Sequence, residues 1–464
     1  MSERFNLVEL LHNHVQRLQF SDLDPHTVSS LKTFILDSLG VGICGSRVPF
    51  SAELIALNQQ WGQGEEAQVL ATGEWLPAPA AAMVNAWQIH NQEFDCVHEP
   101  AVVHPMAVIL AALLAFAQRQ GNVDGKSFMT AISAAVDVAT LLGAASRAPL
   151  RFFRPAVCGA LGATLAMAKL ADMSPEATRN AFGITYSQLS GTMQAHVEGT
   201  AMLAMQVAVN ARNAIQAIDM ARAGLTAPHD VLEGPFGFFK LIEAEADLAA
   251  IVAGLNASPQ INRVSHKPFP TGRACHSGLD ALRTLQQQHG FSADDIASCE
   301  LLAPPLILRL IGRPATAAMS TSYARLCFAY TAATLMQEGD VSVSCYDPQQ
   351  LNDPARLALA QRFVVVDDGN PDPNAMTPQT LKLRLTDQRE FELFSPATLG
   401  SPERPLSREQ HLNKFRRCCA DAIQPLAKSA IERLITTTES LENLSDIAVL
   451  IGLTTPSQIS TGAV

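Results

Sequence analysis

The near-continuous helical periodicity of the first half of this chain limits its fold more than any other feature. From about residue 5 to residue 255, nearly every segment carries apolar residues at the spacing of an amphipathic helix and is rich in Ala, Leu and Met. Capping residues fall between the segments, for example Ser174 followed by Pro175, which suit the cap and the first position of a helix. We therefore expect a large all-α domain over residues 1–265, with helices at about 26–42, 78–92, 105–120, 127–145, 156–171, 175–190, 200–223 and 238–253.

The pattern changes after Lys267-Pro-Phe-Pro. One more helix is expected at about 277–289, followed by strand-like runs at Val341–Cys345, Phe363–Asp367 and Leu381–Phe394. The last run alternates apolar and polar residues on both sides of Thr386-Asp-Gln-Arg389, which is typical of a hairpin. We predict a smaller α+β lid domain over residues 266–400.

The C-terminal segment returns to helical periodicity. It opens with a capping pattern, Ser407 followed by Glu409 and Gln410, and we expect residues 401–464 to dock back onto the helical domain. The predicted fold class is therefore mainly α: a large all-α helical domain and a smaller α+β lid domain.

Composition excludes several classes of protein. The net charge is −11 and no basic tract is present, which argues against nucleic-acid binding. The longest apolar run, Pro105–Ala117, is too short to cross a bilayer, and the first residues are acidic rather than cationic, so we expect a cytoplasmic protein without a membrane partner. The nine cysteines form no CxxC pair, which favours reduced thiols.

Polar residues gather in one short stretch between two apolar helices, EFDCVHEPAVVHP, at residues 93–105. Pro105 suits the first position of the following helix, so His104 is expected at the helix N-terminus, where free N–H groups and the helix dipole favour anions. The sequence predicts a catalytic loop here, with candidate residues Glu93, Asp95, His98, Glu99 and His104.

Two other predicted helix starts carry a cation or an imidazole. Arg154 precedes Pro155, and a stiff loop from Lys267 through Arg273 runs into His276. Three such helix starts would suit a substrate with several carboxylates, because arginine and lysine bind carboxylates and arginine does so in a bidentate manner.

Structural roles compete with these functional ones. His104 is also consistent with a capping or turn residue, and Arg154 with a partner for a surface acid. Glu93, Asp95 and Glu99 are also consistent with a solvated loop face. A metal site is disfavoured, because Glu93, His98 and His104 lack a recognisable ligand spacing on one helix.

The same residues carry a family resemblance. The stretch from Asn85 through His98, followed by His104-Pro105, is similar to the N-G-x-x-x-H-x-x-D-F-D-D-T-H and H-P motifs of the MmgE/PrpD superfamily. Three further motifs match in the same order: Glu233-Gly-Pro-Phe-Gly-Phe-Phe, Lys267-Pro-Phe-Pro through His276, and Pro405-Leu-Ser-Arg-Glu through Lys414-Phe415. The resemblance covers almost the whole chain.

This resemblance implies an architecture and a set of reactions. The architecture is a helical domain, a smaller α+β lid and usually a homodimer, with the active site between the two domains. The activities of the superfamily include 2-methylcitrate dehydration, cis-aconitate decarboxylation and iminodisuccinate epimerisation. Each makes or quenches a carbanion next to a carboxylate, which requires a nearby base and cationic groups for the developing charge.

The chain also departs from the family pattern. The D-F-D-D-T motif becomes Glu93-Phe-Asp-Cys96-Val97, which keeps an acid at the first position. Arg154 stands where the members closest to the decarboxylase have a histidine. A lysine expected within residues 199–212 is missing.

On these grounds we assign roles to the site residues. His104 and His276 are the candidates for proton transfer, and we expect them to face each other across a cleft between the domains. Glu93 or Asp95 would orient a histidine or act as a second acid. The remaining candidates are Lys267, Arg273, Arg154 and His98 for substrate binding, and Tyr330 as a phenolic donor or a core residue.

The sequence therefore predicts a metal-independent lyase, a dehydratase or a decarboxylase, that acts on a small di- or tricarboxylic acid without a cofactor. An epimerase or isomerase of a similar acid is the first alternative. A non-catalytic carboxylate-binding protein is the second, favoured by the missing lysine and threonine and opposed by His104, Lys267 and His276.

Overall fold

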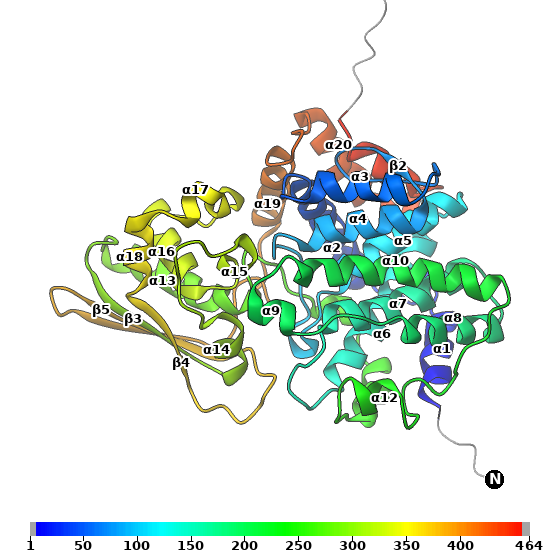
Figure 1. Cartoon of the computed structure of the whole chain (residues 1–464), viewed down its shortest axis with the longest axis horizontal. Helices are drawn as coiled ribbons and strands as arrows, with labels where there is room; N and C mark the ends of the chain where they lie inside the picture. Colours follow the sequence, from blue (N-terminus) through cyan, green and yellow to red (C-terminus); the bar gives the residue numbers. More distant parts are fainter. Residues whose placement is uncertain (1–5, 457–464) are drawn as a thin grey trace, which may run out of the picture.

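A body of packed helices makes up the larger part of the chain, and a unit built on a mixed sheet lies beside it (Figure 1). The computed structural model describes residues 6–456. The prediction of a mainly α protein is confirmed. The main helices of the body are α1 (Leu7–Arg17), α2 (Pro25–Gly45), α3 (Ser51–Trp61), α4 (Ala78–His90), α5 (Pro105–Gln120), α6 (Gly125–Ala144), α7 (Arg154–Leu170), α8 (Pro175–Ser187), α9 (Gln194–Glu198) and α10 (Met202–Arg222).

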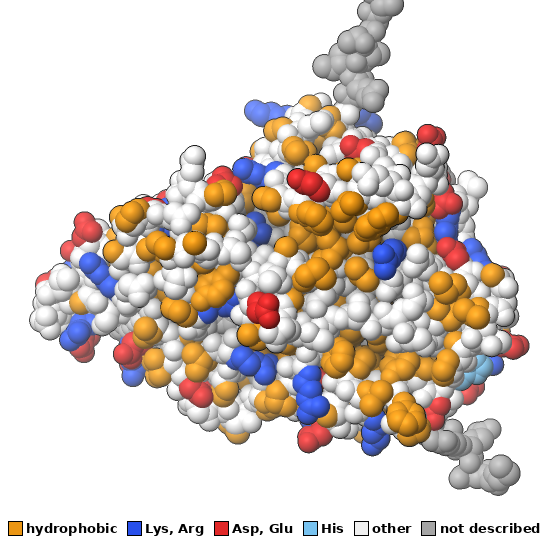
Figure 2. Space-filling model, in the orientation of Figure 1, with side chains coloured by type: hydrophobic (Ala, Val, Ile, Leu, Met, Phe, Trp, Pro, Cys, Tyr) orange, Lys and Arg blue, Asp and Glu red, His pale blue; other side chains and the backbone are white. Residues whose placement is uncertain are grey.

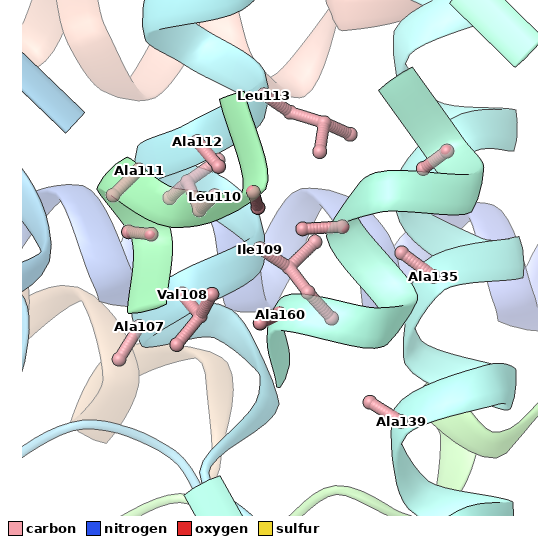
Figure 3. Packing of buried hydrophobic residues seen from close by; sticks show 14 of the residues in the cluster. Ala107, Val108, Ile109, Leu110, Ala111, Ala112, Leu113, Ala135, Ala139 and Ala160 are labelled. Atoms are coloured by element: carbon pink, nitrogen blue, oxygen red, sulfur yellow. The ribbon is translucent and has the colours of Figure 1, made fainter. Parts of the chain in front are cut away.

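Small side chains let the central helices of the body approach closely. Helices α5, α6 and α7 meet through Ala and Gly residues, with Val108 facing Gly159 and Ala135 facing Gly162 (Figure 3). Every residue of α5 from Pro105 to Ala117 is buried. A helix that is apolar all round belongs in a core, and this core fixes the start of α5, where His104 lies.

The smaller unit is organised by a four-stranded sheet of order β4-β3-β5-β6. The central strand β3 runs parallel to β4 and antiparallel to β5, which forms a hairpin with β6. Helices α13 and α16 share the buried core of this unit with the sheet. The bounds are β3 (Ile296–Ala303), β4 (Phe363–Asp367), β5 (Gln379–Leu385), β6 (Glu390–Ser395), α13 (His276–His289), α14 (Pro305–Ile311), α15 (Thr321–Ala324), α16 (Phe328–Glu338), α17 (Pro348–Leu351) and α18 (Pro354–Ala360).

The structure tests the expected strands one by one. The hairpin around Thr386–Arg389 and the strand Phe363–Asp367 are confirmed. The strand expected at Val341–Cys345 is wrong, because Ser342 caps a short 3-10 helix over Val343–Tyr346. Strand β3 was not expected, since polar Ser298 and Glu300 interrupt its apolar pattern.

The helix expected at 238–253 is also wrong. It is divided into α11 (Phe238–Leu241) and α12 (Leu248–Leu255) by a turn in which Ala244 has a φ of 63°. This turn carries Glu243, whose side chain is buried against Arg154.

The C-terminal segment forms α19 (Arg408–Ala420), α20 (Lys428–Glu439) and α21 (Ala448–Leu453). The side chain of Ser407 caps α19 in a capping box with Gln410. Helix α19 packs against α2, where the ring of Phe415 lies over Gly40. The end of the chain is thus part of the helical body, although α19 also lies close to the sheet unit (Figure 1).

Two helices, α2 and α6, are long and apolar enough to cross a bilayer. In the most apolar 18-residue window of each helix, 72% of the residues of α2 and 89% of those of α6 are buried inside the protein, as in the core helices of soluble proteins.

All nine cysteines are buried and unpaired, which agrees with the expected reduced thiols.

Candidate active site

The predicted catalytic loop spans the end of α4 and the start of α5. Glu93 and Val102 have φ angles of 51° and 53°, so the chain turns sharply at both positions. Between these turns, His98 pairs with Val103 and caps a short 3-10 helix at Glu99–Ala101. The loop therefore has a defined shape, and it turns the side chains that follow α4 towards the start of α5.

A backbone bridge joins this loop to the segment that leads into the sheet unit. Val97 N–H donates to Ser265 O at 3.0 Å, and Ser265 N–H donates to Val97 O at 2.7 Å. The bridge places Lys267, two residues further on, against the acids of the loop.

Lys267 forms a buried ion pair with the loop. Its Nζ lies 3.0 Å from Glu93 Oε2 and 3.8 Å from Asp95 Oδ1. The side chains of Lys267 and Asp95 are fully buried, and that of Glu93 is 11% exposed. The structure therefore brings together three of the predicted site residues from two distant segments.

Asp95 holds two imidazoles. Its Oδ2 lies 2.9 Å from Nδ1 of His90 and 3.2 Å from Nδ1 of His104. The two rings meet edge to face, with their centroids 5.0 Å apart. A carboxylate at Nδ1 favours the tautomer with the proton on Nδ1, which leaves Nε2 of His104 as a proton acceptor.

The charges of this cluster are set by burial and by its own members. Burial raises the pKa of Asp95, but the charges of His90 and His104 outweigh it and hold that pKa well below its usual value. Burial is likewise outweighed at Glu93, where Lys267, His90 and His104 lower the pKa to about 2. Both acids are carboxylates at neutral pH.

The surroundings shift the pKa values of the two imidazoles in opposite directions. Burial lowers the pKa of His90, but the charge and hydrogen bond of Asp95 and the charge of Glu93 raise it above the usual value. At His104, burial and the charge of Lys267 outweigh Asp95, so its pKa is lowered. His104 is therefore the neutral imidazole at pH 7, as a general base requires.

A cavity of about 60 Å³ lies beside His104 and Glu93. Its walls come from the helical body, through residues such as Phe153, and from the sheet unit, through residues such as Ile311 and Met376. His104 is 9% exposed and reaches this cavity.

Arg154 lines the cavity, but its guanidinium is already paired. Its Nε lies 3.1 Å and its Nη2 3.0 Å from the carboxylate of Glu243, and Nη2 also donates to Ala148 O at 3.1 Å. Arg154 is fully buried and Glu243 is 3% exposed. The expected bidentate partner of Arg154 is thus found within the chain.

Arg273 also lines the cavity with its donors in use. Its Nε and Nη2 lie 3.0 and 2.8 Å from Glu99 Oε1, and Nη1 donates to the carbonyls of His266 and Leu399. Ser265 Oγ donates to the same Glu99 oxygen at 2.7 Å. This network ties the loop to the sheet unit.

His98 has a structural position. Its Nε2 lies 3.2 Å from Gln260 Oε1, and its Nδ1 accepts from Ala101 N–H at 3.3 Å. Burial and the charge of Arg263 lower its pKa to about 4. His98 does not line the cavity.

The expectation that His104 and His276 share a cavity is not met. His276 is fully buried, donates from Nε2 to Thr271 O at 3.1 Å and does not line the cavity. Its neighbours Arg273 and Ala274 line it instead. The side chain of His276 points the other way, because its ring packs on Phe269 with centroids 5.5 Å apart.

Tyr330 also lies away from the cavity. Its hydroxyl donates to Cys345 O and accepts from Arg356 Nη1 at 3.2 Å, within the core of the sheet unit. Tyr330 is therefore a core residue, which is the structural role that the sequence also allowed.

Three residues at the site were missed by sequence reasoning. His90 lies three residues before Glu93 at the end of α4, a spacing that could have shown it. His196 in α9 lines the cavity, donates from Nε2 to Leu310 O at 3.1 Å, and has a pKa lowered to about 4 by burial and by Arg313. Glu243 gave no local signal, since only the fold places it beside Arg154.

Two buried groups have the side chains of a metal site: His90, Asp95 and His104, and separately Asp37, His266 and His411. In each group one possible ligand atom per residue lies within 4.8 Å of the others. A lysine already neutralises each carboxylate: Lys267 lies 3.8 Å from Asp95 and Lys414 lies 2.7 Å from Asp37. These ammonium groups disfavour a divalent cation at either place.

The arrangement at the cavity is suited to moving a proton. It offers a neutral imidazole oriented by a carboxylate, a buried ammonium and a second imidazole of raised pKa. A proton removed by His104 would leave an anion in the cavity, and Lys267, paired with Glu93 of the cavity wall, is a fixed cation behind that wall.

Comparisons with known proteins agree with the motifs. The sequence model of the MmgE/PrpD N-terminal domain matches residues 9–250, and that of the MmgE/PrpD C-terminal domain matches residues 269–440. Cis-aconitate decarboxylase of Mus musculus is 27% identical over 96% of this chain and 92% of its own length. The human cis-aconitate decarboxylase is 27% identical over 96% and 94%, and that of Aspergillus terreus 22% identical over 94% and 93%.

Proposed function

Because this chain belongs to the MmgE/PrpD family, we propose that it is a lyase that transfers a proton next to a carboxylate of a small organic acid. The observation that carries the proposal is the position of His104. Its Nδ1 lies 3.2 Å from Asp95 Oδ2, while the residue lines a cavity beside Glu93.

His104 acts as the base in this proposal. It takes a proton from the carbon beside a carboxylate, and the electron pair moves onto that carboxylate as an aci-carboxylate dianion. Lys267 stabilises the dianion, and Asp95 stabilises the imidazolium that forms. In decarboxylation the broken bond is instead the one to the leaving carboxylate: CO₂ departs, its electron pair stays as a carbanion, and His104, protonated from solvent beforehand, gives that carbanion a proton, so that one proton is consumed for each CO₂ released.

The relatives favour decarboxylation within this proposal, since those named above are cis-aconitate decarboxylases. Dehydration is the other lyase reaction within the proposal. An epimerase remains the first alternative, because Arg154 with its Glu243 partner cannot shuttle protons as an imidazole could. A carboxylate-binding protein without turnover remains the second.

Deuterium exchange tests the proposal. Methylcitrate, cis-aconitate, itaconate and aspartate-derived acids are incubated with the protein in D₂O, and NMR follows loss of the proton beside each carboxylate. We expect exchange with at least one acid and its loss, by about 100-fold or more, in His104→Gln. His229→Gln is the matched control, because His229 pairs with Asn180 outside the cavity.

The products separate the alternatives. An alkene or released CO₂ identifies a lyase, whereas exchange with a changed optical rotation alone identifies an epimerase. Calorimetry could instead show that an acid binds while neither the wild type nor His104→Gln exchanges its protons. This result would identify a carboxylate-binding protein without turnover.

The substrate must reach the cavity through a movement of the sheet unit. A volume of about 60 Å³ is far below the roughly 300 Å³ of small ligand sites, and both parts of the chain wall it. We propose that the sheet unit is the lid domain expected from the sequence and that it opens for the substrate. Trypsin digestion with and without a bound acid would report this movement.

A homodimer remains a prediction. Apolar side chains gather on the face formed by α4 and α10 (Figure 2). Exposed members of the nearby elements include Phe50, 40% exposed before α3, and Met202, 53% exposed at the start of α10. Light scattering after gel filtration would test the dimer, and cell fractionation would test the cytoplasmic location.

A further inference from the structure

Arg325 differs from the other buried arginines of this chain. It is 4% exposed, and among residues 6–456 no carboxylate lies within ion-pair distance of its guanidinium. A buried charge without a counter-charge is strongly disfavoured, so an anion beside Arg325 would be favoured. The other three buried arginines each pair with a glutamate: Arg154 with Glu243, Arg273 with Glu99, and Arg356 with Glu338.

The guanidinium of Arg325 uses only part of its donors. Nη1 donates to Asn91 O, and the guanidinium carbon lies 5.0 Å from the ring centroid of Tyr346. Nε is buried without an acceptor, and no acceptor within residues 6–456 contacts Nη2. Because guanidinium N–H groups match the oxygens of carboxylates and phosphates, these donors remain for such a group.

The nearby acids do not serve as counter-ions of Arg325. Burial lowers the pKa of Arg325, and carboxylates at longer range, Glu93 and Asp347 among them, oppose this shift. Each of these acids has a closer cation. Lys267 lies 3.0 Å from Glu93, and Arg47 lies 3.8 Å from Asp347.

Arg325 lines a cavity of about 570 Å³ that shares no lining residue with the cavity beside His104. The helical body contributes Pro49 and Trp87 to its wall, and the sheet unit contributes Met319. Helices α9 and α15 both reach this wall, where the two parts of the chain adjoin (Figure 1). Its volume lies within the range of roughly 300–1,000 Å³ that is typical of small-molecule sites.

The start of helix α10 forms another part of the same wall, through Thr200, Ala201 and Ala204. The helix spans 21 residues, and its N-cap, Ala201, makes no side-chain hydrogen bond to the first turn. Within residues 6–456, the N–H groups of Met202 and Ala204 have no acceptor. Free N–H groups and the helix dipole favour an anion at such an end. The cavity therefore combines two independent features that attract negative charge.

One acid, Glu198, stands in the described wall of this cavity. Its side chain is exposed, and its Oε1 accepts from Gln194 Nε2 at 2.5 Å. Water and salt screen an exposed charge, so we expect Glu198 to weaken the binding of an anion without preventing it. This residue provides a variant that should tighten binding.

We infer that this cavity binds a small anion through a phosphate or carboxylate group, which accepts hydrogen bonds from Arg325 and from the N–H groups at the start of α10. The site is separate from the cavity beside His104. The inference does not depend on the proposed lyase activity.

Calorimetry on the whole protein tests the site with two probes, inorganic phosphate and acetate, at constant ionic strength. The probe that binds more tightly identifies the source of the oxygens, a phosphate or a carboxylic acid. We expect Arg325→Gln to weaken binding of that probe by at least about tenfold, and Arg325→Lys to weaken it less. Arg222→Gln is the matched control, because Arg222 lies at the other end of α10 and should leave the affinity unchanged.

Variants at the start of α10 keep the test decisive if Arg325→Gln does not fold. Thr200→Asp adds a negative charge at a place where an acid stabilises a helix, so the protein should fold and bind the probe at least about tenfold more weakly. Thr200→Asn, of similar size and without the charge, should bind as the wild type does. Glu198→Gln should tighten binding by about threefold.

Two results would overturn the inference. The first is that neither probe binds at about 50 mM. The second is that a probe binds with an affinity that neither Arg325→Gln nor Thr200→Asp changes, because the anion would then lie elsewhere on the protein.

Discussion

Lys267 Nζ lies 3.0 Å from Glu93 Oε2, although 174 positions separate the two residues in the chain. The pair joins the loop after α4 to the segment that leads into the sheet unit, and Glu93 lines the same cavity as His104.

Removing one partner of the ion pair should lower the free energy of unfolding more than removing both partners. Lys267→Met leaves Glu93 as a buried carboxylate without its partner, and we expect a loss of about 3–5 kcal/mol in the free energy of unfolding. The double variant Glu93→Gln/Lys267→Met should recover at least about 2 kcal/mol of this loss. Urea unfolding measures both, and additive costs of the two substitutions would contradict the prediction.

Asp95 should matter for turnover more than for binding. Asp95→Asn keeps the size of the side chain but removes the charge that orients His104 and stabilises its imidazolium form. We expect kcat for the proton transfer to fall by about 100-fold or more, with a much smaller change in the dissociation constant of the acid. Equal changes in both quantities would show that Asp95 only shapes the cavity.

The pH profile should have an acid limb set by His104. The base must be neutral, and burial and Lys267 lower its pKa below 6.5, so kcat/KM should be level near pH 7 and fall as the pH drops through that lowered pKa. Lys267→Met removes a charge that lowers the pKa, so its acid limb should move to higher pH. A limb that stays in place or moves to lower pH would assign the titration to another group.

Stability should decrease in acid because of buried neutral histidines. Burial lowers the pKa of His266 to about 3 and that of His411 to about 4, whereas both titrate near 6.5 in the unfolded chain. Above pH 6.5 neither state binds these protons, so there is no effect. Between pH 6.5 and about 4 the unfolded state binds more protons, and the free energy of unfolding falls as the pH falls.

His411→Leu tests that slope. The variant should lose roughly 3 kcal/mol less than the wild type between pH 7 and pH 4, as followed by urea unfolding at each pH. Parallel curves for the two proteins would contradict the prediction. The backbone of the helix should be undisturbed, because Arg408, which donates to His411 Nδ1, keeps Glu439 as its partner.

Close helix packing should make Gly162 intolerant of a methyl group. A Cβ atom at Gly162 in α7 would meet the backbone oxygen of Ala135 in α6, whereas one at Gly452 in α21 would meet nothing within 4 Å. We expect Gly162→Ala to lower the free energy of unfolding by about 1–3 kcal/mol, and Gly452→Ala to leave it unchanged or raise it slightly. Thermal unfolding of the two variants provides the comparison.

Much of the helical body could be predicted from local sequence. The helices α2, α4, α5 and α7 follow the apolar period, and Pro105 and Pro155 mark starts that the structure confirms. The clustering of Glu93, Asp95 and His104 was also visible, because these residues lie within twelve positions of one another. Local spacing and helix-end preferences are sufficient for features of this kind.

The contacts between distant segments were decided only by the tertiary structure. Sequence alone assigned Arg154 and Arg273 to the substrate, but folding brings Glu243 and Glu99 to them. It also turns His276 into the core of the sheet unit, although Arg273, three residues earlier, reaches the cavity. The sequence determined which residues can carry charge or a proton, because that is a property of the side chain. The fold determined which partner each of them has and which of them reach the cavity, because only the path of the whole chain brings distant segments together.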